Sequence, residues 1–249
     1  MHIFTTFGGN ITTKKEYAYT TQSDLTNLTP TNTINYTYGN NNWKDQLTSY
    51  NGNAITYDAI GNPTSYNGNT YTWQNGRELA TLTNTSQNLS ISYKYDDAGI
   101  RTQKTVNGTV TNYFLEGANV IYEKTGNDLT YYSYDEVGQI IGMNRNGTQY
   151  FYIHNLQGDI IGLLDDTLQQ VVGYVYNSWG VPISITDGNG NDVSNNASHI
   201  ANINPYRYRR LQIRYGNSDS IIYKVDIIVQ SSEDLSMLMD LYQIQVLDC

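Results

Sequence analysis

Cysteine is almost missing from this chain of 249 residues, because the only one is the last residue, Cys249. A disulfide framework and a cysteine-ligated metal site are therefore excluded. Proline is scarce, with 4 residues, and no apolar run reaches the length that spans a membrane as a helix. The N-terminus has no basic stretch followed by an apolar segment, so we expect no signal peptide in it.

Positive charge is also in short supply. The chain has 14 basic and 23 acidic residues, which gives a net charge of −9, and neither sign forms blocks. A nucleic-acid surface needs clustered Lys and Arg to neutralise phosphates. The sequence therefore predicts no nucleic-acid partner.

Tyrosine and glycine, by contrast, are abundant, with 24 and 21 residues, which favours strands and turns over helices. One motif occurs three times between residues 131 and 182: an aromatic residue, Asp or Asn, two residues, Gly, and a short apolar run. Its period of roughly twenty residues is typical of a repeat array. The repeat residues are Tyr57, Asp58 and Gly61; Tyr95, Asp96 and Gly99; Tyr134, Asp135 and Gly138; Asn155 and Gly158, after His154; and Tyr176, Asn177, Trp179 and Gly180.

This spacing has a structural reason that needs no catalysis. A carboxylate or amide at the first turn position can accept a hydrogen bond from the backbone N–H two residues on, and Gly at the fourth position adopts angles that other residues resist. Asn107-Gly108 and Asn146-Gly147 predict tight hairpins, because Asn-Gly supplies both positive-φ residues of a type I′ turn. Each repeat is therefore predicted to be strand, turn, strand, with neighbouring repeats covering its aromatic face.

These repeats, followed by Asn-Pro-Tyr-Arg-Tyr-Arg at residues 204 to 209, resemble the YD-repeat (Rhs, wall-associated) family of exported bacterial proteins. The segment from Tyr174 to Pro182 resembles the entry to that family's core. The resemblance implies an all-β fold of repeated hairpins that form a spiralling antiparallel sheet, part of a YD-repeat shell. It also implies an enclosed C-terminal toxin and cell-surface or secretion components as partners in full-length relatives, which are exported, and no cofactor.

Four regions follow from this comparison. Residues 1–33 are a truncated, degenerate start, in which Thr5 and Thr6 replace the Tyr-Asp pair, and residues 34–173 are the repeat region. Residues 174–209 begin the core. Residues 210–249 lose the repeat and are predicted to be non-native, and either disordered or helical.

The genetic code offers an explanation for this tail. The family continues with Gly-Tyr-x-Tyr-Asp-x-Glu-Thr-Gly-Leu-Tyr-Tyr. Codons chosen for Arg210 to Asn217, shifted by one base, encode Gly-Tyr-Arg-Tyr-Asp-Thr-Glu-Thr, and codons for Ser218 to Val246, shifted again, encode GLYYLQSRYYSPEFGRFINADGFIPNSS. The sequence thus predicts two single-base frame changes, and gene sequencing that finds incompatible codons would refute them. The resemblance implies that full-length relatives cleave themselves beyond the core, using acidic residues there. On this hypothesis the translated frame lacks those residues, and we expect no self-cleavage.

Candidate chemistry outside the repeat is weak. The pairs Asp96-Asp97 and Asp165-Asp166 are expected to have a turn or solvated role, because adjacent residues on a strand would face opposite ways and could not converge on one site. The three histidines, His2, His154 and His199, lack metal-ligand spacing. Residues 187–192 imitate half of a calcium loop but have Ser198 where the bidentate Glu belongs. Ser178 lacks the Gly-x-Ser-x-Gly context. We expect no catalytic, cofactor or metal site and therefore no enzyme.

The leading hypothesis is a structural fragment of a shell protein. One alternative is a cell-surface module that binds carbohydrate through exposed rings such as Trp73 and Trp179. Another is a pseudogene remnant without function.

Overall fold

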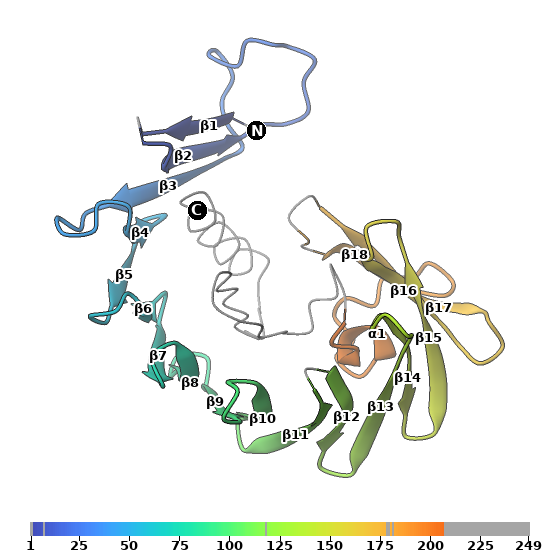
Figure 1. The fold of residues 1–249 in the computed structure, drawn as a ribbon. Coiled ribbons are helices and arrows are strands. Elements are labelled where there is room, and N and C mark those ends of the chain that lie inside the picture. The colour runs from blue at the N-terminus through green and yellow to red at the C-terminus, as the bar shows by residue number, and fades with distance from the viewer. Residues whose placement is uncertain (1, 7, 118, 178–179, 181, 207–249) are drawn as a thin grey trace. The chain divides into compact units, whose positions relative to one another are not determined.

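The fold is all-β, as the repeat predicts, in the computed structural model, which describes residues 2–6, 8–117, 119–177, 180 and 182–206. These residues form 18 strands and one short helix (Figure 1). The chain divides into two compact units, one running to Ser90 and one starting at Ile91.

The first unit is a meander in which each strand pairs antiparallel with the next. Its strands are β1 (His2–Thr5), β2 (Ile11–Glu16), β3 (Asn32–Tyr38), β4 (Leu47–Tyr50), β5 (Asn53–Tyr57), β6 (Pro63–Tyr66), β7 (Asn69–Gln74) and β8 (Glu78–Asn84). Strand β9 (Leu89–Tyr95) begins in this unit and continues into the second.

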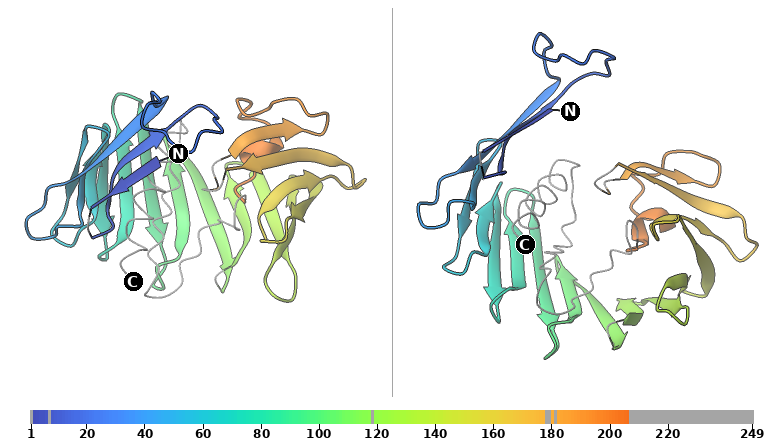
Figure 2. Two further views of the ribbon diagram at one scale, coloured as in Figure 1. Left: turned by 90° about the horizontal axis from the view of Figure 1, so that it is seen from above. Right: turned by 45° about the horizontal axis from the view of Figure 1, so that its top comes forward.

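The second unit follows the same rule of consecutive antiparallel pairs from β9 to β18. Its elements are β10 (Arg101–Val106), β11 (Thr109–Glu116), β12 (Asn119–Thr125), β13 (Asp128–Tyr134), β14 (Ile140–Arg145), β15 (Thr148–His154), β16 (Ile160–Leu164), β17 (Gln170–Tyr176), β18 (Pro182–Asp187) and the helix α1 (Ile200–Ile203). Strands β11 to β18 curve around α1 (Figures 1 and 2).

Two kinds of turn recur along the meander. Asn-Gly pairs, in which both residues have positive φ, follow β4, β6, β7, β10 and β14, for example 47° at Asn107 with 85° at Gly108, and 50° at Asn146 with 91° at Gly147. Both hairpins predicted at these sites are confirmed. Longer turns that begin with Thr, Asp or Asn follow β1, β5, β9, β13, β15, β16, β17 and β18. Those at Asp165 and Asp187 follow even-numbered strands, so turns of this kind are not confined to one end of the hairpins.

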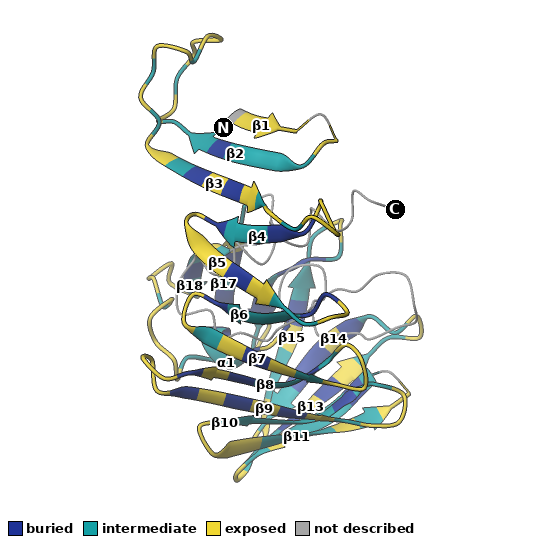
Figure 3. Ribbon diagram, turned by 90° about the vertical axis from the view of Figure 1, so that its left-hand side faces the viewer, coloured by how far each residue is buried: buried dark blue, intermediate teal, exposed yellow. Residues whose placement is uncertain are grey.

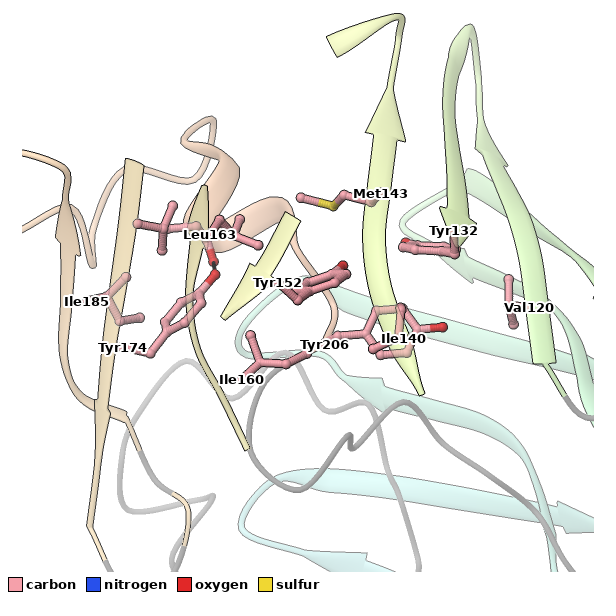
Figure 4. Packing of buried hydrophobic residues seen from close by; sticks show 12 residues of the cluster. Val120, Tyr132, Ile140, Met143, Tyr152, Ile160, Leu163, Tyr174, Ile185 and Tyr206 are labelled. Atoms are coloured by element: carbon pink, nitrogen blue, oxygen red, sulfur yellow. Dashed lines mark hydrogen bonds between the residues drawn. The ribbon is translucent and has the colours of Figure 1, made fainter. Parts of the chain in front are cut away.

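Side chains alternate between the two faces of each sheet, as extended strands require. In β3, Ile34 and Tyr36 are buried while their neighbours are more exposed (Figure 3). In the second unit the buried side chains of β12 to β18 join Ala201 and Tyr206 in one core cluster (Figure 4). The segment that contains α1 is thus part of the core of this unit.

Candidate functional site

The aspartate of the repeat organises the turn that follows it. Asp135 Oδ1 accepts hydrogen bonds from the backbone N–H groups of Val137 (3.1 Å) and Gln139 (2.6 Å). The backbone closes the same loop, because Asp135 N–H donates to the carbonyl of Gln139 at 2.8 Å and Gly138 N–H donates to the carbonyl of Asp135 at 3.0 Å. Gly138 has φ 74°, so glycine removes the strain that a side chain would bring.

The other predicted repeat residues take the same positions. Asp58, Asp96 and Asn155 each accept from the N–H groups two and four residues on. Gly61, Gly99 and Gly158 have φ between 73° and 89°. In the last repeat Gly180 N–H donates to the carbonyl of Asn177 at 3.0 Å. Trp179 and Ser178 lie outside the described residues, as does the segment from Arg207 onward.

The degenerate repeat at Thr6 also forms such a turn, and two further turns, at Asp165 and Asp187, were missed by the sequence analysis. Thr6 uses its hydroxyl, which accepts from Asn10 N–H at 3.1 Å. Asp165 starts a turn in which Leu168 takes the glycine position with φ 63°. Asp187 starts another, with Gly190 at φ 83°. The Asp187-x-x-Gly190 spacing was visible in the sequence, whereas nothing marked Leu168 as a glycine substitute.

The structure also locates the acidic residues considered as candidate chemistry. The pairs Asp96-Asp97 and Asp165-Asp166 lie in turns, as the favoured interpretation predicted. The calcium-like loop from Asp187 is a repeat turn, whose carboxylate accepts from the N–H groups of Asn189 and Asn191 and from the Asn191 side chain. The described residues hold no group of three or more His, Cys, Asp or Glu side chains that could bind a metal ion.

The hydrogen bonds in these turns stabilise the ionised carboxylates. The Thr167 hydroxyl and the N–H groups of its turn lower the pKa of Asp165, and the Asn191 side chain does the same for the pKa of Asp187. Burial acts to raise the pKa of Asp58, but its bonds from Asn62 and the turn backbone prevail and lower it. These aspartates are thus acceptors at neutral pH rather than proton donors.

The aromatic residue at or near the end of several odd-numbered strands has its own role. It sits beside a β-bulge, and a bulge leaves backbone groups outside the ladder. In five repeats its polar atom donates to a carbonyl on the preceding strand, and we call these bonds pins. They are Tyr38 to Ile11 (3.0 Å), Tyr57 to Leu47 (2.6 Å), Trp73 to Pro63 (2.7 Å), Tyr134 to Val120 (2.8 Å) and Tyr176 to Ile160 (2.7 Å).

The residue two positions earlier forms a second aromatic row on the same face. In the second unit, three members of this row and one pin residue contact the segment 199–206, which we call the core segment. Tyr174 Oη donates to the carbonyl of Ala201 at 2.7 Å, and Tyr152 Oη donates to Asn204 Oδ1 at 2.9 Å. Tyr134 Oη lies 2.9 Å from Tyr206 Oη. Consecutive odd strands β13, β15 and β17 therefore each contribute one hydroxyl.

The core segment is folded to match this row. His199 caps α1, its Nδ1 accepting from Ala201 N–H at 3.2 Å. The Asn204 side chain donates to the carbonyl of Tyr206 at 2.7 Å and accepts from Tyr206 N–H at 3.2 Å. Asn204 and Tyr206 are both 2 % exposed. The tyrosine rings of 132 and 152 flank Tyr206, with centroids 4.9 Å and 6.1 Å from its ring.

Burial raises the pKa of Tyr132, Tyr152 and Tyr206 well above the ordinary value, and neighbouring phenols and the Glu123 carboxylate add to the shift. These phenols therefore stay neutral and serve as hydrogen-bonding groups. The site holds a peptide segment.

Of the two tryptophans considered for sugar binding, Trp73 has a structural partner, and Trp179 lies outside the described residues. The Trp73 indole N–H donates to the backbone of Pro63. On the outer face of the second unit, Phe114 and Tyr122 stack at 4.0 Å with an interplanar angle of 10°, so that one face of each ring is covered by the other. His154 lies beside Tyr152, with ring centroids 6.3 Å apart.

Comparison with known proteins agrees with this geometry. A sequence model of the Teneurin YD-shell family matches residues 2–192. The chain belongs to this family. The resemblance seen in the repeats is thereby confirmed.

Curated relatives of this YD-shell chain include the tRNA nuclease WapA of Bacillus subtilis (strain 168), 39% identical over 176 residues, and the tRNA3(Ser)-specific nuclease WapA of Bacillus spizizenii, 38% identical over 176 residues. Each match covers 69% of this chain and 7% of the relative, so the chain spans a small part of their length. Among solved structures, TcdB2-TccC3-Cdc42 matches with a TM-score of 0.46 and 12% identity, over 84% of this chain and 13% of that one. No helix among the described residues is long and apolar enough to cross a membrane.

Proposed function

We propose that this chain forms a section of the wall of a YD-repeat shell that, in a longer protein, encloses a C-terminal toxin. It contributes rigid sheet rather than chemistry. Export and contact with the cell surface belong to the longer protein.

The observation that carries this proposal is the recurrence of the pins in both units. Each pin joins an odd-numbered strand to the strand before it, so the register is fixed locally at these five strand pairs. A wall needs this property, because its length is then independent of any single central core.

A chimera tests the proposal. Residues 2–192 replace the matching stretch of a full-length WapA relative, and protease protection of the C-terminal nuclease is measured. We expect the nuclease to remain protected as in the unmodified relative. A matched chimera carrying Asp58→Ala and Asp135→Ala should lose protection, because two turns lose their organising acceptors.

A flexible Gly-Ser spacer of the same length is the second control. If the spacer protects the nuclease as well as this chain does, the chain is not acting as wall and the proposal fails.

We further propose that residues 2–206 carry no catalytic activity, and that the nuclease function named for the relatives resides outside this stretch. The carbohydrate alternative is tested on a glycan array. Saturable binding that Trp73→Ala abolishes would favour it, whereas we expect Trp73→Ala to weaken the sheet without changing glycan binding.

A further inference from the structure

We propose that Tyr134, Tyr152 and Tyr174 form a peptide-binding row that recognises a helical turn followed by Asn-Pro-Tyr, and that the row accepts this peptide from outside when the chain's own core segment cannot dock. The partner class is a short neutral peptide with the chemistry of residues 199–206. This inference does not depend on the enclosure of a toxin.

The first support is the match between hydroxyls and segment positions, in which the Tyr174 hydroxyl also accepts from Asn204 Nδ2 at 3.3 Å. Tyr174 reaches a backbone carbonyl at Ala201, Tyr152 the side-chain oxygen of Asn204, and Tyr134 the phenol of Tyr206. A backbone acceptor sets the position of the turn, while an amide and a phenol are side-chain features. The row therefore distinguishes Asn and Tyr from other residues at two places.

The second support is that the segment is preorganised by its own bonds. Asn202 N–H and Ile203 N–H both return to the carbonyl of His199, at 2.9 Å and 3.1 Å. The Asn204 side chain closes on the backbone of Tyr206 through two hydrogen bonds. A ligand that holds its bound shape by itself loses less conformational entropy on docking, which favours binding as a free peptide.

The third support is that the core segment is deeply buried but is joined to β18 through a loop. Ala201, Asn204 and Tyr206 are at most 2 % exposed, so the segment fills a prepared place. Between the end of β18 at Asp187 and His199, only Asp192 forms a bridge to a strand, with Thr186. The segment is therefore attached through a loop rather than as a further strand of the sheet.

The test uses the full chain with Asn204→Ala and Tyr206→Ala, whose own segment has lost two of its three recognition groups. A fluorescein-labelled peptide of residues 199–206 is added, and anisotropy is recorded. We expect saturable binding at least tenfold tighter than to the wild-type chain, in which the row is occupied. Adding Tyr152→Phe to the receptor should weaken binding about tenfold, and a peptide with Ala in place of Asn204 should be weakened similarly.

Equal binding of a scrambled peptide, or binding unchanged by Tyr152→Phe, overturns the proposal. Absence of binding to a receptor whose sheet amides keep their hydrogen-exchange protection also overturns it.

If the double variant does not fold, the proposal is tested with Tyr152→Phe in the otherwise native chain. Amide exchange at Asn202 to Asn204 should accelerate about tenfold relative to Tyr131→Phe, an outward-facing control, while β13 and β15 stay protected. Unchanged exchange at these amides contradicts recognition through the row.

Discussion

The same position of the repeat has different partners in the two units. Tyr36 in the first unit and Tyr152 in the second both lie two residues before the residue that precedes the turn. Tyr36 packs edge-on against its cross-strand partner Tyr50, with ring centroids 5.2 Å apart at 87°, and Tyr50 meets Tyr66 at 6.4 Å. Tyr152 instead donates to Asn204 of the core segment. The repeat thus places a row of aromatic rings on one face of the sheet. The segment that contacts the row then decides whether each ring only packs or also donates a hydrogen bond.

The largest difference between the two units is expected when the Tyr206 ring is removed from the core of the second unit. Tyr206→Ala should lower the free energy of unfolding of the second unit by about 3–5 kcal/mol, because it empties a buried aromatic site. Hydrogen exchange should accelerate in β13 to β17 and stay unchanged in β3 to β7. Tyr19→Ala, at a side chain that is 94% exposed, is the control. Equal acceleration in both units would show that the core segment does not belong to the second unit alone.

A milder change separates the hydroxyl from the ring. Tyr152→Phe should cost about 1–3 kcal/mol, because the buried Asn204 oxygen loses a donor. Chemical denaturation followed by exchange at Asn204 measures this. A cost below that of Tyr131→Phe would mean that the Tyr152 bond contributes nothing.

Two glycine substitutions sharpen the comparison at the turns. Gly158→Ala should cost about 1–2 kcal/mol, from the left-handed backbone alone, since no atom lies within 4 Å of the added Cβ. Gly61→Ala should cost more, because its Cβ would lie 2.5 Å from the Trp43 ring. Trp43 fluorescence should shift in the Gly61 variant only. Equal costs and an unchanged spectrum would show that Trp43 moves away freely.

Acid should act on the aspartate turns and spare the threonine turn. The pKa values of Asp58, Asp165 and Asp187 are lowered by folding. Their contribution to stability is therefore complete above the unfolded value, about 3.9, and is lost as pH falls through the folded pKa. Amide exchange, corrected for its intrinsic pH dependence, should speed up at 58–62, 165–169 and 187–191 but not at the turn closed by Thr6. Uniform loss of protection would contradict this.

The smallest effect is expected at Leu168. Leu168→Gly removes about 1–2 kcal/mol of left-handed strain but adds about 0.5–1 kcal/mol of unfolded-chain entropy, so a gain of about 0.5 kcal/mol should remain. Thermal unfolding measures it, with Gly138→Leu as the reciprocal change. Destabilisation by Leu168→Gly would show that the side chain contributes packing at this position.

Local patterns in the sequence predicted most of the fold. Asp135-x-x-Gly138 and Asn146-Gly147 specify their turns through their own side chains and backbone, so the fold class followed from them. The turn at Asp165 was missed because a leucine with positive φ, Leu168, substitutes for the usual glycine. The binding of Asn204 by Tyr152, 52 positions away, depends on how strands stack. No local pattern encodes that pairing.

The reach of the pins has a genetic consequence. Each pin joins only two neighbouring strands. Duplicating or deleting an even number of strands therefore leaves every other pin intact and keeps each remaining turn at the same end of the hairpins. Loss of a single strand would reverse the direction of all strands after it and move each aspartate turn to the opposite end. Recombination between repeats can therefore lengthen or shorten this protein in steps of two strands while each surviving hairpin keeps its geometry.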